Sequence, residues 1–296
     1  MERRLNHIRV IAPGLLTTVQ DLGRPGYAHW GISASGAADA LSLRAGNLLV
    51  GNPEGTAGLE ITLLGGTLEF ESAALIAFTG ADFDAGIPMW QAVEVKPGQP
   101  VRCGPARSGA RGYLCVAGGI TVPLVLGSAS THLVTGLGGW HGRALKRGDV
   151  LPLGDPPGVA RPRRETAPPP AATAELRVTA SGDAGILCRA TWHVKEDSDR
   201  MGLRLRGPVL ERETSHMLTE GVPLGAVQAP PDGQPIILFV EHQTTGGYPK
   251  ISNVISADFH ALGQLRPRAE VAFEHVSMDT ALALLRAQED WLHRLV

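Results

Sequence analysis

Two short stretches of the sequence pair an acidic side chain with an arginine close to a glycine. Asp21 precedes Arg24 by three residues in QDLGRPG, and Asp199 directly precedes Arg200 in DSDRMG. An acid and a guanidinium across one turn are suited to holding a carboxylate or an amide substrate. The alternative is an Asx turn whose local ion pair only fixes the loop. These four residues are our candidates for catalysis.

A second group of candidates lies in the stretch HQTTGGY. Gln228, in GAVQAP, adds a polar residue at the end of an apolar strand. The polar residues of HQTTGGY and Gln228 could together bind a ureido or lactam group, whose C=O and N–H edges need complementary hydrogen bonds. A polar hairpin at a barrel rim or at an interface with another protein is the alternative. The predicted substrate-binding residues are Gln228, His242, Gln243, Thr244, Thr245, Gly246, Gly247 and Tyr248.

Other polar residues have simpler interpretations. Ser35 and Asp39, in SASGAAD, predict a helix N-cap more readily than a nucleophile. Glu60 opens an apolar strand, and a buried acid there would need a partner such as Arg24 or Arg111. The three cysteines show no CxxC spacing, and the ten histidines show no HxH or HExxH. We therefore predict no catalytic cysteine and no metal site.

The composition narrows the class of protein. The chain has 296 residues, of which 43% are hydrophobic, and its 27 basic and 29 acidic residues give a net charge of −2. This near balance offers no argument for binding nucleic acid or an anionic membrane. No apolar run approaches the ~18 residues of a membrane span or forms a secretory signal. We expect a cytoplasmic protein.

The pattern along the chain predicts a mainly β fold with a few short helices. Thirty-seven glycines and 22 prolines separate short apolar runs, as strands closed by frequent turns require. Helical spacing appears in only a few places. Examples are residues 37–52 and the C-terminal stretch after Ser277 or Asp279, either of which could cap it. The expected strands include residues 59–70, 73–80, 111–119, 234–242 and 269–276.

The two halves of the chain also resemble each other. Four segments recur in the same order, among them HIRVIAPG with ELRVTASG, and a strand followed by Gly118–Gly119 or by Gly246–Gly247. Such order indicates duplication of one β-barrel, with both glycine pairs making sharp turns at positive φ. We expect a first barrel over residues 1–155, a Pro-rich linker over 156–174 and a second barrel over 175–296.

Long motifs in both halves resemble a known family. They are TTVQDLGRPGYAHWGISASGAAD (17–39), VAGGITVPLVLGSAST (116–131), EGVPLGAVQAPPDGQPIIL (220–238) and HQTTGGYPKISNVISADF (242–259). The chain resembles the KipA / allophanate hydrolase subunit 2 family, whose members are also called C subunits of 5-oxoprolinase. This family is related to the carboxyltransferase domain of urea carboxylase. Two departures are Arg268, where a glycine is usual, and Glu241–His242, where an acid is usual before QTTGGY.

This resemblance implies two tandem cyclophilin-like β-barrel domains and a role in a complex. Together with KipI-like (B) and LamB/YcsF-type (A) subunits, the chain would open 5-oxoproline to glutamate at the expense of ATP, and it would be inactive alone. One alternative is a carboxyltransferase component that uses carboxybiotin on urea or a related amide. The other is a non-catalytic protein that binds a KipI-like kinase inhibitor. The sequence has no P-loop, and GLGGWHG lacks a phosphate-binding lysine, so ATP is expected at the level of the complex.

Overall fold

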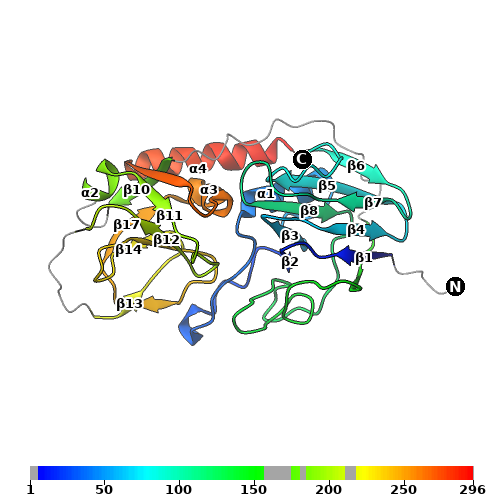
Figure 1. The fold of residues 1–296 in the computed structure, drawn as a ribbon, viewed down its shortest axis with the longest axis horizontal. Helices are drawn as coiled ribbons and strands as arrows, with labels where there is room; N and C mark the ends of the chain where they lie inside the picture. The colour runs from blue at the N-terminus through cyan, green and yellow to red at the C-terminus, as the bar shows by residue number, and fades with distance from the viewer. Residues whose placement is uncertain (1–5, 157–174, 181–184, 211–217, 296) are drawn as a thin grey trace. The chain divides into compact units, whose positions relative to one another are not determined.

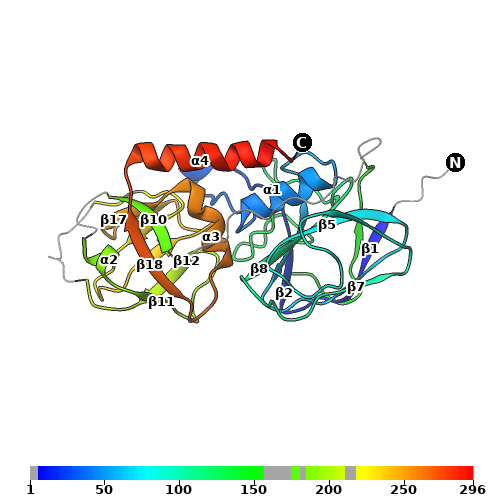
Figure 2. The same ribbon diagram turned by 90° about the horizontal axis from the view of Figure 1, so that it is seen from above.

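The computed structural model describes residues 6–156, 175–180, 185–210 and 218–295. The chain divides into two compact units (Figures 1 and 2). The first contains Met1–Arg24, Ser35–Pro170 and Trp291–Val296, and the second contains Pro25–Ala34 and Ala171–Asp290. The predicted linker over 156–174 lies, apart from its first residue, outside the described residues.

The first unit consists of two antiparallel sheets and one helix. The strand order is β7-β4-β1-β9 in one sheet and β2-β3-β8-β5-β6 in the other. The elements are β1 (His7–Ala12), β2 (Leu16–Gln20), α1 (Ala40–Leu49), β3 (Gly58–Thr62), β4 (Thr67–Phe70), β5 (Ala74–Gly80), β6 (Ala92–Val95), β7 (Pro100–Arg102), β8 (Arg111–Val116) and β9 (Val150–Pro152).

The run 59–70 forms two strands rather than one. β3 lies in the five-stranded sheet and β4 in the four-stranded sheet, with Gly65 and Gly66 between them. A Cβ at Gly66 would lie 2.0 Å from the carbonyl oxygen of Ala12, and one at Gly65 would lie 2.2 Å from Cβ of Cys103. The chain can pass from one sheet to the other here because neither residue has a side chain.

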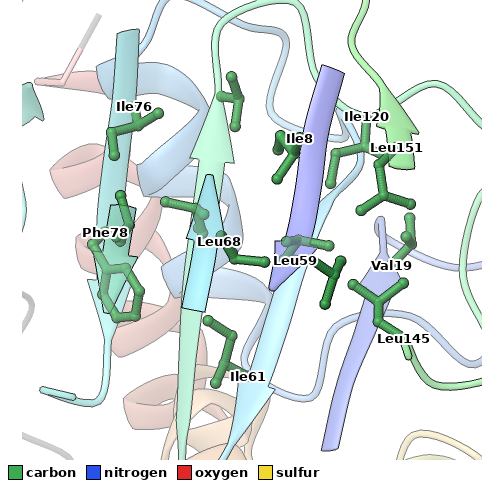
Figure 3. Packing of buried hydrophobic residues seen from close by; sticks show 14 of the residues in the cluster. Ile8, Val19, Leu59, Ile61, Leu68, Ile76, Phe78, Ile120, Leu145 and Leu151 are labelled. Atoms are coloured by element: carbon green, nitrogen blue, oxygen red, sulfur yellow. The ribbon is translucent and has the colours of Figure 1, made fainter. Parts of the chain in front are cut away.

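The core of the first unit is formed by side chains from both sheets (Figure 3). Leu59 and Ile61 point from the same face of β3 into this core, while Glu60 between them is buried on the opposite face. β8 is buried along its whole length, and burial raises the pKa of the Cys115 thiol on this strand. Burial likewise raises the pKa of Cys103 to about 12. Neither thiol is therefore a ready nucleophile at neutral pH.

The two predicted helices are confirmed, together with their caps. The carboxylate of Asp39 accepts a hydrogen bond from the backbone N–H of Ser42 at 2.9 Å and so caps α1. The hydroxyl of Ser277 accepts one from the N–H of Thr280 at 3.1 Å, at the start of α4 (Met278–His293). Side-chain oxygens at these positions satisfy N–H groups that the first helical turn leaves unpaired.

In the second unit, seven strands close into a barrel in the order β10-β17-β14-β15-β12-β11-β18. Leu176, Leu205, Ile237 and Val271 contribute to its fully buried interior. The elements are β10 (Glu175–Ala180), α2 (Gly185–Arg189), β11 (Trp192–Val194), β12 (Gly202–Arg206), β13 (Glu220–Gly221), β14 (Ala226–Gln228), β15 (Ile236–Leu238), β16 (Thr245–Gly246), β17 (Lys250–Val254), α3 (Phe259–Gln264), β18 (Glu270–His275) and α4. β13 and β16 pair separately as a two-stranded sheet. The predicted mainly β fold is confirmed.

No helix in the described part of the chain has the length and apolar character needed to cross a membrane.

Arg268, the departure noted in the sequence, lies in a turn with φ +69°. A left-handed backbone costs a non-glycine residue about 1 kcal/mol, and the ion pair of Arg268 with Glu196 is on the surface, where such pairs contribute little. We expect Arg268→Gly to increase the free energy of unfolding by roughly 0.5–1 kcal/mol, measured by urea unfolding. Arg268→Ala removes the same ion pair but keeps the strain, so an equal increase in that variant would contradict this explanation.

Candidate functional site

Asp21, at the end of β2, is a support for a neighbouring loop. It is buried, and one carboxylate oxygen accepts hydrogen bonds from the N–H of Gly23 at 2.7 Å and from the hydroxyls of Ser128 at 2.7 Å and Ser130 at 2.5 Å. The other oxygen accepts one from the N–H of Ala129 at 2.6 Å. Four donors occupy this carboxylate, which therefore fixes residues 128–130 to the end of β2.

Arg24 is buried beside the same loop. Its Nη2 donates to the carbonyl oxygen of Ser130 at 2.5 Å, and its Nε donates to that of Val125 at 3.4 Å. A Cβ at Gly138 would lie 2.2 Å from the Ser130 oxygen and 2.8 Å from Nη2 of Arg24. The glycine-rich stretch GLGGWHG thus packs on this loop. Asp21 and Arg24 both reach Ser130, and these contacts are internal.

Asp199 and Arg200, the second acid–arginine pair, do not bind the same partners. Asp199 is exposed, and one of its oxygens accepts from the N–H groups of Met201 at 2.8 Å and Gly202 at 3.1 Å, which is an Asx turn. Arg200 is buried, and its Nε forms an ion pair with Glu241 at 2.5 Å. The acid next to QTTGGY is therefore the partner of this arginine.

A pocket of about 530 Å³ lies on the second unit. It brings together four of the predicted site residues from well-separated parts of the sequence: Asp199, Gln228, Gln243 and Tyr248. The other residues that line it are Lys195, Met201, Gly202, Arg204, Leu205, Pro230, Pro231, Asp232, Gln234, Pro235, Ile236 and Leu238. Polar and charged side chains make up half of this lining, so the pocket offers a small molecule many hydrogen-bonding groups beside its apolar ones.

Gln228 is the most buried polar residue of the pocket, with 1% of its surface exposed. It lies at the end of β14, where the pairing with β17 shifts between Val227 and Gln228. Such irregularities change the direction of a side chain next to a site. Its Nε2 donates to the carbonyl oxygen of Tyr248 at the long distance of 3.4 Å.

The prediction that Gly246–Gly247 repeats the turn of Gly118–Gly119 is wrong. The earlier pair has φ of +88° and +70°, whereas neither later glycine has positive φ. Gly246 lies in β16, paired with Glu220 of β13. Its lack of a side chain has a different use, because a Cβ there would lie 2.7 Å from Nε2 of Gln228.

The remaining candidates of HQTTGGY do not line the pocket. His242 is half-buried and its Nδ1 lies 2.7 Å from the carbonyl oxygen of Gln243. Burial lowers the pKa of His242, and this contact opposes the shift. Thr245, on β16, and Gly247 are both exposed. The carbonyl oxygen of Thr244 accepts a hydrogen bond from the N–H of Val222.

Of the four charged residues that line the pocket, sequence reasoning named Asp199 and missed Lys195, Arg204 and Asp232. Lys195 and Arg204 both reach Asp197, at 3.3 and 3.9 Å, and Asp232 lies in the turn PPDGQP. Arg204 could have been noticed in the sequence, because it alternates with apolar residues along β12 and therefore lies on the exposed face of that strand. Within the described residues, no three His, Cys, Asp or Glu side chains gather in a way that could hold a metal ion.

The two aspartates can be tested with the same substitution. In Asp21→Asn, either amide orientation places the new NH₂ group against a backbone N–H, of Gly23 or of Ala129. We expect the free energy of unfolding to fall by roughly 2–3 kcal/mol. In Asp199→Asn the remaining oxygen can still accept both hydrogen bonds, so a change within about 0.5 kcal/mol is expected. Equal losses in urea unfolding would show that Asp21 has no special structural role.

Comparison with known proteins identifies the family. Residues 30–275 match the carboxyltransferase domain, subdomains A and B. The chain is 40% identical over 292 residues to the C subunit of 5-oxoprolinase from Haemophilus influenzae, covering 94% of each chain. It is also 40% identical over 305 residues to the protein of that name from Escherichia coli (strain K12), covering 97% of each.

A solved structure extends the match to the fold. The chain superposes on the urea amidolyase of K. lactis with a TM-score of 0.88 and 30% identity, over 100% of this chain and 20% of that one. The resemblance seen in the sequence motifs is thereby confirmed. Since the family match spans most of its residues and two relatives of similar length share 40% of them, the chain belongs to the carboxyltransferase-domain family, subdomains A and B.

Proposed function

We propose that this chain is the C subunit of an ATP-dependent 5-oxoprolinase, which opens 5-oxoproline to glutamate in the cytoplasm together with LamB/YcsF-type (A) and KipI-like (B) subunits. The observation that carries the proposal is the 40% identity, along almost the whole length, to two proteins that bear this name. A chain that matches such relatives in length is expected to share their assembly.

The pocket of the second unit supports a role in holding the substrate. Its 530 Å³ is ample for a five-membered lactam, and Gln228 and Gln243 supply carboxamide groups. When water that gives up a proton to a base adds to a lactam carbonyl, negative charge develops on the carbonyl oxygen, and fixed N–H donors stabilise that charge. ATP is supplied at the level of the complex, and the proposed contribution of this chain is to bind and orient the lactam.

A second candidate is a carboxyltransferase component that takes a carboxyl group from carboxybiotin to urea or a related amide. The specific observation in its favour is the superposition on a urea amidolyase. Since the chain corresponds to 20% of that enzyme, the match concerns one module of a longer protein. The two candidates share a scaffold and a small amide substrate, and they differ in the co-reactant.

Reconstitution tests the proposal. With the two partner proteins and ATP, we expect turnover of 5-oxoproline to appear only when this chain is added, and we expect none from the chain alone. Glutamate and inorganic phosphate are measured in parallel, and avidin is added to a matched sample. Turnover that is unchanged without this chain would contradict the proposal. In a parallel sample with urea, bicarbonate, ATP and a biotin carboxylase with its biotinylated carrier, carboxylation of urea that needs this chain and that avidin abolishes would favour the carboxyltransferase instead. A tight complex without turnover would favour a binding role.

A further inference from the structure

The carboxamide of Gln228 is almost completely removed from water but little used by the protein. It donates one long hydrogen bond, 3.4 Å to the carbonyl oxygen of Tyr248. Within the described part of the chain, its oxygen accepts none. A glutamine side chain has two N–H donors and an oxygen with two lone pairs, so most of its hydrogen-bonding capacity is unused by the described residues. The pocket wall therefore contains an acceptor and a donor that are available to a ligand.

The geometry of a carboxamide decides which ligand uses both groups at once. Its N–H and C=O lie side by side on one edge, so their complement is a ligand edge with C=O and N–H side by side. A cis amide has this edge, whereas an open-chain trans amide does not. Lactams and cyclic ureido groups are held in the cis form by their rings. A ketone, an ester or an N-alkylated lactam lacks the N–H and leaves the Gln228 oxygen unpaired.

We propose that Gln228 is the specificity-determining residue of this pocket, pairing through its carboxamide with the cis-amide edge of a lactam or cyclic ureido ligand, and that Gly246 leaves the space this carboxamide needs. The inference rests on the proposed function for the choice of site. It adds the atoms that distinguish the ligand: Oε1 of Gln228 accepts the ligand N–H, and the Nε2 hydrogen not directed at Tyr248 donates to the ligand carbonyl.

Gly246 gives this proposal its sharpest structural support. A methyl group at this position would lie 2.7 Å from Nε2 of Gln228, closer than real Cβ contacts, whereas the nearest atom to a Cβ at Gly247 is Oγ1 of Thr219 at 3.7 Å, an ordinary contact. Neither glycine needs its backbone freedom, because neither has positive φ. The two adjacent glycines therefore differ in what an alanine would meet, and only Gly246 is coupled to the carboxamide.

The first experiment varies the ligand on the full-length chain. Binding of 2-pyrrolidinone, N-methyl-2-pyrrolidinone and 2-imidazolidinone is followed by ligand-observed NMR titration. We expect the N-methyl compound to bind about tenfold more weakly or worse than its parent, because a site built around a hydrogen bond rejects a ligand that lacks it. If 2-pyrrolidinone binds more tightly than 2-imidazolidinone, the pocket prefers a lactam. If 2-imidazolidinone binds more tightly, the pocket prefers a cyclic ureido group. Equal binding of the methylated and parent lactams, or no binding of either ring, would overturn the proposal.

The second experiment varies the protein. We expect Gly246→Ala and Gln228→Glu to weaken binding of the better ring about tenfold or more, since the first displaces the carboxamide and the second removes its donor. Gly247→Ala is the matched control and should bind like the unchanged chain. Gln20→Leu controls for loss of a buried glutamine elsewhere, because Gln20 lies in the first unit and does not line the pocket. Equal effects of the two alanine substitutions would overturn the proposal.

The outcomes separate this inference from the proposed function. If reconstituted turnover requires the chain but the two glycine variants bind alike, the place of the chain in the 5-oxoprolinase complex stands and the role of Gln228 falls. If the N-methyl penalty and the glycine contrast are found but the chain adds nothing to turnover, the role of Gln228 stands and the place in the complex falls.

Discussion

A polar group that leaves water on folding loses free energy unless it finds a partner, and Asp21 and Gln228 differ in how far the protein supplies one. The buried carboxylate of Asp21 accepts hydrogen bonds from four donors of the protein. Among the described residues, the buried carboxamide of Gln228 makes one long hydrogen bond. Residue type alone favoured Asp21 for catalysis and gave Gln228 an accessory role. The hydrogen bonds of the two side chains favour Gln228 over Asp21 as the residue that contacts a ligand.

Glycine is used in the same way in both units, to let backbone approach a buried polar side chain. Gly138 allows the glycine-rich stretch to close over the Ser130 carbonyl and Arg24, and Gly246 allows β16 to pass beside Gln228. In the first case the side chain below is already bonded to the loop that it supports. In the second it faces a pocket. A glycine next to a polar side chain therefore lets a supporting loop pack closely in the first unit, and in the second it leaves room for a side chain that lines the pocket.

Local patterns made much of the fold predictable, and distant contacts account for what was missed. Asp39 and Ser277 cap their helices through residues three positions away, so sequence spacing was sufficient. The role of Asp21 depends on residues 128–130, more than a hundred positions later, which no local pattern indicates. Gly246 was misjudged for the same reason, because matching it to Gly118 ignores the pairing of β16 with β13. The pocket gathers strand ends, and periodicity does not say which ends meet.

The charged residues of the pocket are of both signs. Lys195 and Arg204 both reach Asp197, and Asp199 and Asp232 line the same walls. A ligand carboxylate would meet acids as well as bases there. The carboxamide of Gln228 is neutral, and only 1% of the residue's surface is exposed. A ligand of this pocket is therefore distinguished at its amide edge, which is the feature that lactams and cyclic ureido groups share.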